Sequence, residues 1–283
     1  MAKDDLETIA RSICKRRGMR YLQRVAEGAF KETFHVVDAD AKPRALKVYK
    51  AVGSDRRDQR EIEAMLRCDH PSVARLLSVE TYGRGTTKFV AITEEFLSGG
   101  TLASRAPVTA ATCLQIGDAL ISALAHIACL KLVHRDIKPD NIMFRSDGLT
   151  PVITDFGVVR DLTDSSATPT WAPRGPGTPF FAAPEQLNNE KSLIDWRTDQ
   201  FALGVSLSFV TIGDHPYRTR GLSDRGVVDR VASRQPPAPW FEKAATPIGL
   251  TALLPMVAAW PVNRYRKPET LRKAWLAQKG KSA

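Results

Sequence analysis

The eight residues His134–Asn141, which read HRDIKPDN, constrain this chain more than any other segment. They follow two apolar residues, Leu132 and Val133, so the pattern places them in a loop at the end of a strand. Fourteen residues after Asn141, the triplet Asp155-Phe156-Gly157 follows the apolar run 152–154. Both segments therefore place acidic side chains in loops that come directly after strands.

Phosphoryl transfer needs the groups that these two segments supply. A carboxylate must orient the attacking hydroxyl and accept its proton. Oxygen ligands must hold a divalent cation against the nucleotide phosphates, because charge neutralisation and positioning supply most of the catalysis. The residue types and their order therefore favour an enzyme that transfers a phosphoryl group.

The motif order resembles that of the eukaryotic-type (Hanks-type) serine/threonine protein kinases, from about residue 21 to residue 272. The resemblance implies an α+β, bilobal fold, with a small antiparallel β-sheet lobe that carries one helix and a larger, mainly helical lobe. It implies an N-terminal extension at 1–20, expected to be helical, an N-lobe at 21–97 and a C-lobe at 98–283.

The same resemblance implies a role for each matching residue in the two loops. Asp136 is the catalytic base, and Lys138 contacts the transferred phosphoryl group. Asn141 and Asp155 hold the metal ions. His134 is expected to be structural, packing against the phenylalanine of the Asp-Phe-Gly triplet.

The first lobe supplies an ion pair by the same resemblance. Lys47, in the segment Ala45-Leu46-Lys47, grips the α- and β-phosphates. Glu61 is its partner on the inserted helix, preferred to Glu63 because Glu61 lies nine residues before His70-Pro71, the spacing usual in the family.

Three further motifs are structural in the family. Ala183-Pro184-Glu185 closes the activation segment, and Arg264 is expected to pair with Glu185. The residues 199–204 match the buried helix that anchors the catalytic loop.

The glycine-rich loop departs from the family pattern, because Gly28 is its only remaining glycine. Glycines let backbone N–H groups approach phosphates closely, so weaker nucleotide binding is expected. Lys31 is either an extra cation near the phosphates or a solvent-facing side chain, and Thr33 replaces an apolar residue. The implied nucleotide contacts are Val25, Ala26, Glu27, Gly28, Ala29, Phe30, Lys31, Glu32, Thr33, Ala45, Lys47, Glu95, Phe96, Leu97 and Met143.

The segment before Gly99-Gly100 leaves an alternative open. Either Glu94 or Thr93 takes the position that controls access behind the adenine. A buried carboxylate there needs a partner or a raised pKa. In both alignments, backbone groups from Glu95 to Leu97 are expected to bind adenine.

Substrate class and control also follow from the resemblance. Lys138 and Thr178 are typical of kinases that phosphorylate serine or threonine. Arg135 is expected to bind a phosphate on the activation loop, which makes autophosphorylation a hypothesis. The alternative is that Asp161 or Asp164 already supplies the negative charge. The candidate acceptors are Thr163, Ser165, Ser166, Thr168 and Thr170.

The implied cofactors are ATP and Mg²⁺, with Mn²⁺ as the alternative metal, and the implied partners are protein substrates. A pseudokinase that binds nucleotide without turnover stays open, supported by the altered glycine loop. A small-molecule kinase of related fold is the other alternative, and the motif Ala183-Pro184-Glu185 argues against it.

Charge and composition indicate which partners and which cellular location to expect. The net charge of +10 indicates either an acidic partner such as nucleic acid or, as we prefer, solvated surface. The four cysteines form no Cys-x-x-Cys pair, which fits reduced thiols. We find no apolar run long enough for a membrane span and no secretory signal, so we expect a cytoplasmic protein. The oligomeric state is not indicated.

The spacing of apolar residues and the positions of turn residues predict the secondary-structure elements. Strands are expected at 21–25, 34–38, 44–49, 75–80 and 88–96, with two short strand pairs near 132–133 and 142–154. Helices are expected at 4–17, 55–67, 109–130, 198–212 and 249–260. A loop is expected at 160–179.

Overall fold

The computed structural model describes residues 5–27, 31–51, 63, 65–84, 87–155 and 179–278. These residues belong to two compact units. Unit 1 takes the described residues up to 69 together with 74–97, and unit 2 takes 70–73 with the described residues from 98 onward. Most of the helix expected at 55–67, and nearly all of the loop expected at 160–179, lie outside the described residues.

Unit 1 is built on an antiparallel sheet of five strands, in the order β1-β2-β3-β5-β4. Each strand covers one of the five strands predicted for this region and differs from it by a few residues at its ends. The fold class, α+β, is confirmed by this sheet and by the helices of unit 2. The strands are β1 Arg20–Glu27, β2 Lys31–Val37, β3 Pro43–Ala51, β4 Leu76–Arg84 and β5 Thr87–Glu95.

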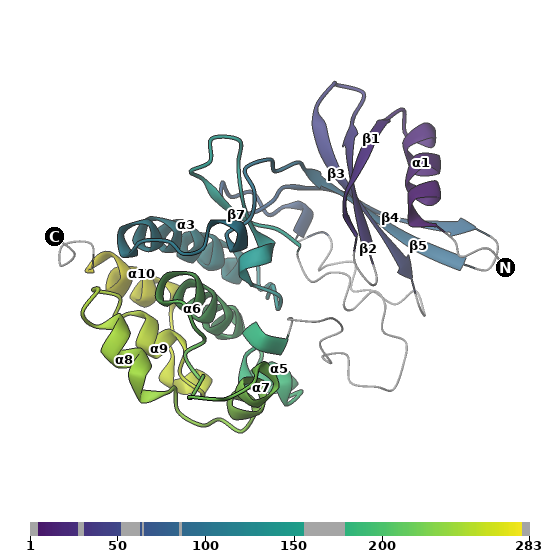
Figure 1. The fold of residues 1–283 in the computed structure, drawn as a ribbon. Helices are drawn as coiled ribbons and strands as arrows, with labels where there is room; N and C mark the ends of the chain where they lie inside the picture. Colours follow the sequence, from purple (N-terminus) through teal and green to yellow (C-terminus); the bar gives the residue numbers. More distant parts are fainter. Residues whose placement is uncertain are drawn as a thin grey trace. The chain divides into compact units, whose positions relative to one another are not determined.

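Helix α1, Leu6–Arg16, covers one face of this sheet (Figure 1). Side chains alternate between the two faces of a strand, so Phe34, Leu46 and Ala91 all face the helix. The helix meets them with Ile9, Ala10, Ile13 and Cys14, the stripe that helical spacing predicts. The other face of the sheet carries Lys47.

Both ends of α1 are fixed by side chains. The Asp5 carboxylate accepts the backbone N–H of Glu7 and caps the first turn. Arg17, just past the last turn, donates to the hydroxyl of Thr93 on β5 at 2.8 Å and pairs with Glu80 on β4 at 3.3 Å. The helix is therefore attached to two strands as well as packed on them.

Unit 2 is mainly helical. Its long helices are α3 (Ala110–Cys129) and α6 (Trp196–Ile212), and its one described strand pair is β6 (Ile142–Phe144) with β7 (Pro151–Ile153). The other α-helices are α5 Pro184–Leu187, α7 Asp224–Ala232, α8 Pro239–Ala245, α9 Leu253–Met256 and α10 Pro268–Leu276. Single 3₁₀ turns are η1 Ala103–Arg105, η2 Pro139–Asn141, η3 Pro179–Phe181, η4 Lys191–Leu193 and η5 Pro261–Asn263.

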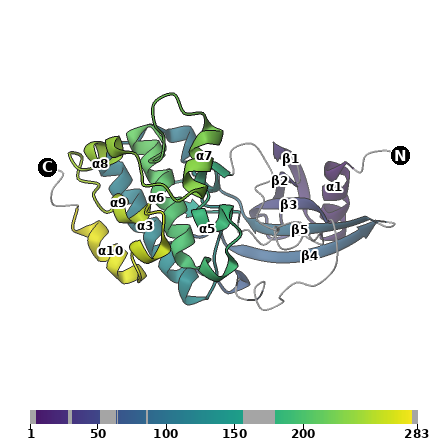
Figure 2. The same cartoon turned by 90° about the horizontal axis from the view of Figure 1, so that it is seen from below.

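Helix α3 packs between α6 and α10 (Figure 2). Gly117 lets α10 approach, because a Cβ at this position would collide with the ring of Trp275. The indole N–H of Trp275 donates to the carbonyl of Leu114 at 3.0 Å, which satisfies the polar atom of this buried ring.

By length and composition alone, α3 could cross a membrane, which our sequence analysis did not anticipate. Half of its apolar segment is buried inside the structure. Nine of its residues are buried in the core of unit 2, which is how the central helix of a folded domain packs.

Two predicted elements are wrong. Leu132 and Val133 form no strand. The strands β6 and β7 pair with each other, and the isolated bridges beside them go to Thr101 and Val73 instead. The helix expected at 249–260 is reduced to α9, because Gly249 has a φ of 74° before it and Pro261 begins a 3₁₀ turn after it. The helices predicted at 4–17, 109–130 and 198–212 are confirmed.

The contact between α1 and the sheet can be tested by replacing Ile13 with alanine. Ile13 is buried in the helix–sheet cluster, so Ile13→Ala leaves a cavity and we expect a loss of about 2–5 kcal/mol in unfolding free energy. Urea denaturation measures this loss. The control is Ser12→Ala, an exposed position on the same helix. Equal stability of the two variants would show that α1 does not pack on the sheet in solution.

Candidate active site

The short hairpin of β6 and β7 brings the two polar loops of unit 2 together. Ile142 pairs with Ile153, and the backbone N–H of Thr154 donates to the carbonyl of Asn141 at 2.9 Å. Asn141 therefore lies at the start of one strand, and Asp155 lies just beyond the end of its partner. Residues that are fourteen positions apart in the sequence leave the hairpin at the same end.

Asp136, Lys138 and Asn141 form one polar cluster. The side-chain amide of Asn141 donates to the carbonyl of Asp136 at 2.8 Å and to its carboxylate at 3.0 Å. The ammonium of Lys138 lies 3.5 Å from the same carboxylate oxygen. These contacts orient the Asp136 carboxylate with a cation beside it.

The buried carboxylate of Asp199 fixes the loop that carries this cluster. Its two oxygens accept the backbone N–H groups of His134, at 2.7 Å, and Arg135, at 2.8 Å. Burial raises the pKa of Asp199 to about 7, and the two N–H donors act against that rise. Arg135 has a φ of 64°, a conformation that is costly without such support. The expected anchoring by the 199–204 segment is confirmed.

His134 is structural in its contacts. Its side chain is fully buried, and one ring nitrogen lies 3.1 Å from the carbonyl of Thr154. The other ring nitrogen accepts the backbone N–H of Asp136 at 3.3 Å. Phe156, against which the ring was expected to pack, lies outside the described residues.

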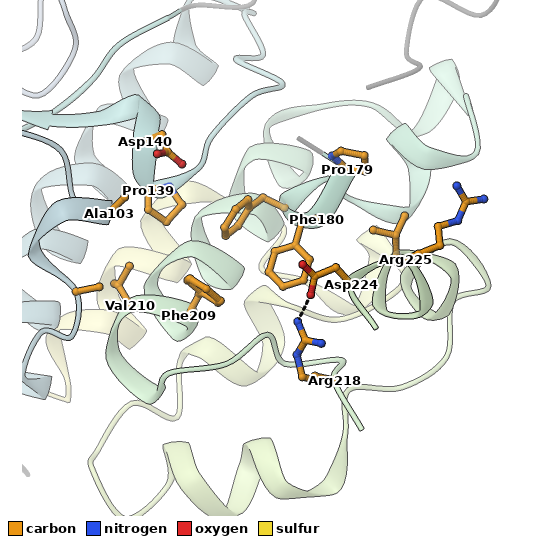
Figure 3. Close-up of a pocket in the computed structure, with 13 residues that line it drawn as sticks. Ala103, Pro139, Asp140, Pro179, Phe180, Phe209, Val210, Arg218, Asp224 and Arg225 are labelled. Carbon is orange, nitrogen blue, oxygen red and sulfur yellow. Dashed lines mark hydrogen bonds and ion pairs between the residues drawn. The ribbon is translucent and has the colours of Figure 1, made fainter. Parts of the chain in front are cut away.

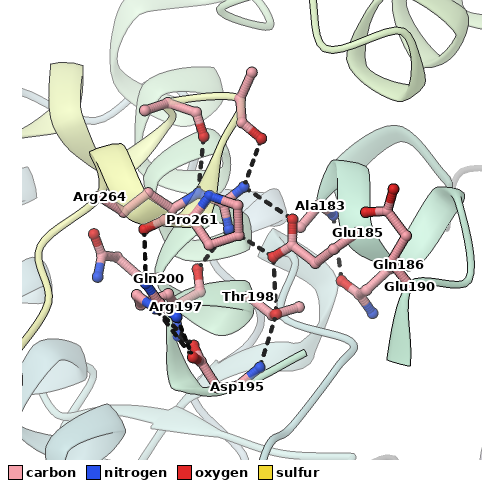
Figure 4. Close-up of polar contacts among 12 residues, drawn as sticks. Ala183, Glu185, Gln186, Glu190, Asp195, Arg197, Thr198, Gln200, Pro261 and Arg264 are labelled. Carbon is pink, nitrogen blue, oxygen red and sulfur yellow. Dashed lines mark hydrogen bonds and ion pairs between the residues drawn. The ribbon is translucent and has the colours of Figure 1, made fainter. Parts of the chain in front are cut away.

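A buried ion pair joins Glu185 to Arg264, as predicted (Figure 4). The guanidinium donates to both carboxylate oxygens, at 2.6 and 3.0 Å. The hydroxyl of Thr198 on α6 donates to the same carboxylate at 2.9 Å. The adjacent Gln186 donates to the carbonyl of Arg135 at 2.9 Å, so this ion pair is connected to the catalytic loop.

The residues of unit 2 fit a magnesium or manganese ion. Mg²⁺ is usually held by one or two carboxylates together with waters and substrate phosphates. Because the Asn141 amide nitrogen donates to Asp136, its oxygen is the atom that can bind a cation. Over the part of the chain that the structure describes, no cluster of three or more His, Cys, Asp or Glu side chains could hold a metal by itself. Asn141 and Asp155 supply an amide oxygen and a carboxylate, which are ligand types that suit such an ion.

In unit 1, Lys47 forms an ion pair with Glu94. Lys47 is on β3 and Glu94 on β5, and the cross-strand partner of Glu94 is Ala45. Ala45, Lys47 and Glu94 consequently share one face of the sheet. Thr93, the alternative in the sequence alignment, lies on the opposite face, where Arg17 binds its hydroxyl. Glu94 is thus the one of the two that faces Lys47.

Two of the expected nucleotide contacts at the edge of the sheet, Lys31 and Thr33, lie on this same face. Lys31 and Thr33 pair with Tyr49 and Lys47 respectively, so neither side chain points toward α1. The ammonium of Lys31 lies 5.9 Å from the centre of the Tyr49 ring, which places it by the sheet rather than simply in solvent. Val25, Ala26 and Glu27 are exposed on β1, and Glu32 precedes Thr33 on β2.

Residues 95–97 and Met143 complete the expected set within the described residues. The backbone N–H of Glu95 donates to the carbonyl of Arg75 at 3.0 Å, so that N–H is not offered to a ligand. The ring of Phe96 stacks on His35 with centroids 3.8 Å apart, and Leu97 is buried. Met143, in unit 2, is half-buried on β6. Glu61, Gly28, Ala29 and Phe30 lie outside the described residues.

A mostly apolar pocket of about 440 Å³ lies beside the catalytic loop in unit 2 (Figure 3). Phe180 from η3 and Phe209 from α6 line it, with ring centroids 5.7 Å apart. Val228 from α7 and Pro139 from η2 are also in its wall. Arg218 forms an ion pair with Asp224 at the side of the pocket.

Sequence reasoning missed two features of these sites. The sequence indicated that a buried Glu94 needs a partner, but it did not identify Lys47 as that partner. Once the register of β3 and β5 is known, the alternation of side chains places both residues on one face. Sequence reasoning also missed the pocket, whose wall comes from several segments that are far apart in the sequence. The only signal for that wall was the pair Phe180-Phe181 directly before Ala182-Ala183-Pro184.

Comparison with known proteins gives consistent matches. The family model described as protein kinase domain matches residues 19–242. The serine/threonine-protein kinase Pkn1 of Myxococcus xanthus is 32% identical over 186 residues, covering 64% of this chain and 26% of that protein. The human MAP kinase-activated protein kinase 2 is 26% identical over 238 residues, covering 79% of this chain and 57% of that protein. The chain spans about a quarter of the length of several such relatives.

The crystal structure of the Mycobacterium tuberculosis PknI kinase domain has a similar fold. Its TM-score is 0.66 at 22% sequence identity, and the match covers 92% of this chain and 96% of that one. At this identity the similarity establishes the fold alone.

The Glu185–Arg264 pair predicts a large stability effect. Glu185→Gln leaves the buried guanidinium of Arg264 without its counter-charge, and we expect a loss of about 3–5 kcal/mol in unfolding free energy. The control is Arg272→Gln, which breaks a surface pair with Asp118 and should cost less than about 1 kcal/mol. Denaturant unfolding compares them, and similar small losses in both variants would contradict a buried pair.

Proposed function

This chain belongs to the protein kinase family, and on that premise we propose that it transfers the γ-phosphate of ATP to serine or threonine hydroxyls of proteins. The observation that carries the proposal is the cluster of Asp136, Lys138 and Asn141 on a loop anchored by Asp199. A carboxylate, a cation and an amide oxygen in this arrangement are what phosphoryl transfer requires.

In the proposed reaction, Asp136 accepts the proton of the attacking serine or threonine hydroxyl. The hydroxyl oxygen forms a bond to the γ-phosphorus, the bond from that phosphorus to the bridging oxygen breaks, and ADP leaves. Lys138, 3.5 Å from the Asp136 carboxylate, is close enough to contact the phosphoryl group that passes between hydroxyl and ADP. Its positive charge offsets the charge that develops there.

Asn141 and Asp155 are proposed to hold Mg²⁺, or Mn²⁺ in its place. The bound ion neutralises phosphate charge and fixes the phosphates for attack. The Asn141 side chain would do two tasks, since its nitrogen orients Asp136 and its oxygen would be left to bind the cation. Asn141 would thereby position the catalytic base and also provide a ligand of the metal.

Unit 1 is proposed to supply the nucleotide contacts. Lys47 binds the α- and β-phosphates, and Glu61 pairs with it, by similarity to the family. Ala45, which is buried beside Glu94, contacts the adenine. Lys31, by its position on the same face as Lys47, is proposed to add a cation that offsets the loss of glycines in the loop before it.

Specificity for serine or threonine is proposed from Lys138 and Thr178. Autophosphorylation between residues 163 and 170 is a further proposal, with Arg135 as the group that binds the resulting phosphate. Those acceptor residues and Thr178 lie outside the described residues.

The pocket lined by Phe180, Phe209 and Val228 is proposed to receive an apolar side chain of the protein substrate. It includes Asp140, one residue before Asn141, so a peptide seated there would continue past the catalytic loop. The enclosing rings are polarisable and apolar, which favours a hydrophobic or aromatic residue.

Transfer of label from γ-labelled ATP tests the activity. With Mg²⁺ or Mn²⁺, the wild type should label itself and a generic basic protein, and Asp136→Ala should reduce the rate about 10²- to 10⁴-fold through loss of the base. Asp229→Asn, an exposed carboxylate on α7, is the matched control and should keep the wild-type rate.

Mapping the labelled residues by mass spectrometry completes this test. Phosphoserine or phosphothreonine between residues 163 and 170 would support both the specificity and the autophosphorylation. An active preparation with that segment unmodified would exclude autophosphorylation there. Absence of label in the wild type would favour the nucleotide-binding scaffold.

Filling the pocket tests its role in substrate binding. Val228→Phe places a larger side chain in the pocket wall, so we expect KM for a peptide substrate to rise about tenfold while KM for ATP is unchanged. Val262→Phe makes the same exchange at an exposed position on η5 and should change neither constant. Steady-state kinetics with both substrates varied gives the answer, and an unchanged peptide KM would remove the pocket from substrate binding.

A further inference from the structure

The ion pair between Lys47 and Glu94 lies on the face of the unit 1 sheet opposite α1, and it is buried. The side chains keep only 5% and 9% of their accessible surface. A buried ammonium and a buried carboxylate each lose water, and close pairing compensates for that loss. The pair is therefore an integral part of the lysine's surroundings, not a chance surface contact.

Strand register determines where the Glu94 carboxylate lies. The pairing of β3 with β5 runs without interruption from Arg44 opposite Glu95 to Ala51 opposite Lys88. On the other side of β5, the pairing with β4 shifts between Leu76 and Ser78. The pairing of β5 with β3 is therefore the regular one, and it holds Glu94 diagonally across from Lys47.

On the α1 face of the sheet, β5 is held in place at the neighbouring residue. The preceding residue, Thr93, is 1% exposed, and its hydroxyl accepts a hydrogen bond from Arg17. Arg17 also pairs with Glu80 on β4. Helix α1 thus secures β5 from behind where β5 presents Glu94 to the lysine.

We propose that Glu94 is a positioning residue for Lys47. Its carboxylate, carried by the sheet itself, holds the ammonium in place for the nucleotide phosphates. This inference rests on the proposed function, in which Lys47 binds those phosphates. The family's usual partner comes from the inserted helix, whereas Glu94 stays where β5 holds it whatever position that helix takes.

The neighbouring carboxylate cannot take this role. Glu95 is one residue further along β5, so its side chain points to the other face. Its carboxylate accepts the backbone N–H of Arg75 at 2.9 Å. Glu94 is the β5 carboxylate that shares a face with Lys47.

The kinetic test compares Glu94→Gln, Glu94→Asp and Asp40→Asn in the full chain. Glu94→Gln keeps the shape and removes the charge, so kcat/KM for ATP should fall at least tenfold, while KM for the peptide substrate stays unchanged. Glu94→Asp retains the charge and should recover part of the loss. Asp40→Asn removes an exposed carboxylate from the turn between β2 and β3 and should leave both constants at the wild-type value.

A second measurement needs no turnover. Without nucleotide, an amine-acylating reagent is applied at fixed pH and the modification of Lys47 is followed by peptide mass spectrometry. In Glu94→Gln the buried amine loses a partner that favours its charged form, so the labelling rate should rise several-fold over wild type. Asp40→Asn should label at the wild-type rate.

Thermal stability provides a third test, which applies even if Glu94→Gln folds poorly. Glu94→Met should lower the thermal midpoint, and the double variant Lys47→Met with Glu94→Met should recover most of it, because the ammonium is then removed together with its carboxylate partner. Wild-type ATP kinetics in Glu94→Gln, or an unchanged Lys47 labelling rate, would overturn the proposal. An inactive wild type would defeat the proposed function instead, and the labelling rates would still decide whether Glu94 holds Lys47.

Discussion

The buried carboxylate of Asp199 is the interaction on which the reactive loop of unit 2 depends. It holds two consecutive backbone N–H groups, those of His134 and Arg135, from the first turns of α6. Helix α6 begins with a capping box between Asp195 and Thr198, so the position of Asp199 is set by the start of the helix. The unusual φ of Arg135 follows, and Asp136 is the next residue.

The same helix connects that loop to the buried ion pair. Thr198, one residue before Asp199, donates to Glu185, and Glu185 is held by Arg264. From α5, Gln186 returns to the carbonyl of Arg135. These contacts form a continuous network of short, mostly buried hydrogen bonds. A change at Arg264 can therefore affect the position of Asp136 through this network, without any contact with a substrate.

Residues adjacent in sequence could be predicted well, because local chemistry determines their structure. The apolar stripe of α1 follows from helical spacing. The pairing of Glu185 with Arg264 and the anchoring of the catalytic loop join distant residues, and they are predicted only from the resemblance of their motifs to the family. The strand expected at 132–133 failed because two apolar residues do not define a strand when a partner strand is missing. The helix expected at 249–260 failed because apolar content hid the effects of Gly249 and Pro261.

The pairing of Lys47 with Glu94 could not be derived in the same way. Thr93 and Glu94 are adjacent, and a shift of one residue in register would exchange the faces to which they point. The sequence carries no local signal that distinguishes the two registers, because residues 89–92 are apolar and buried on both faces of the strand. The register is decided by burial on the α1 side, where Phe89 and Ala91 must join Leu46 and Val48 in the core. That apolar face places Thr93 against Arg17, and it obliges the next residue, Glu94, to face the lysine.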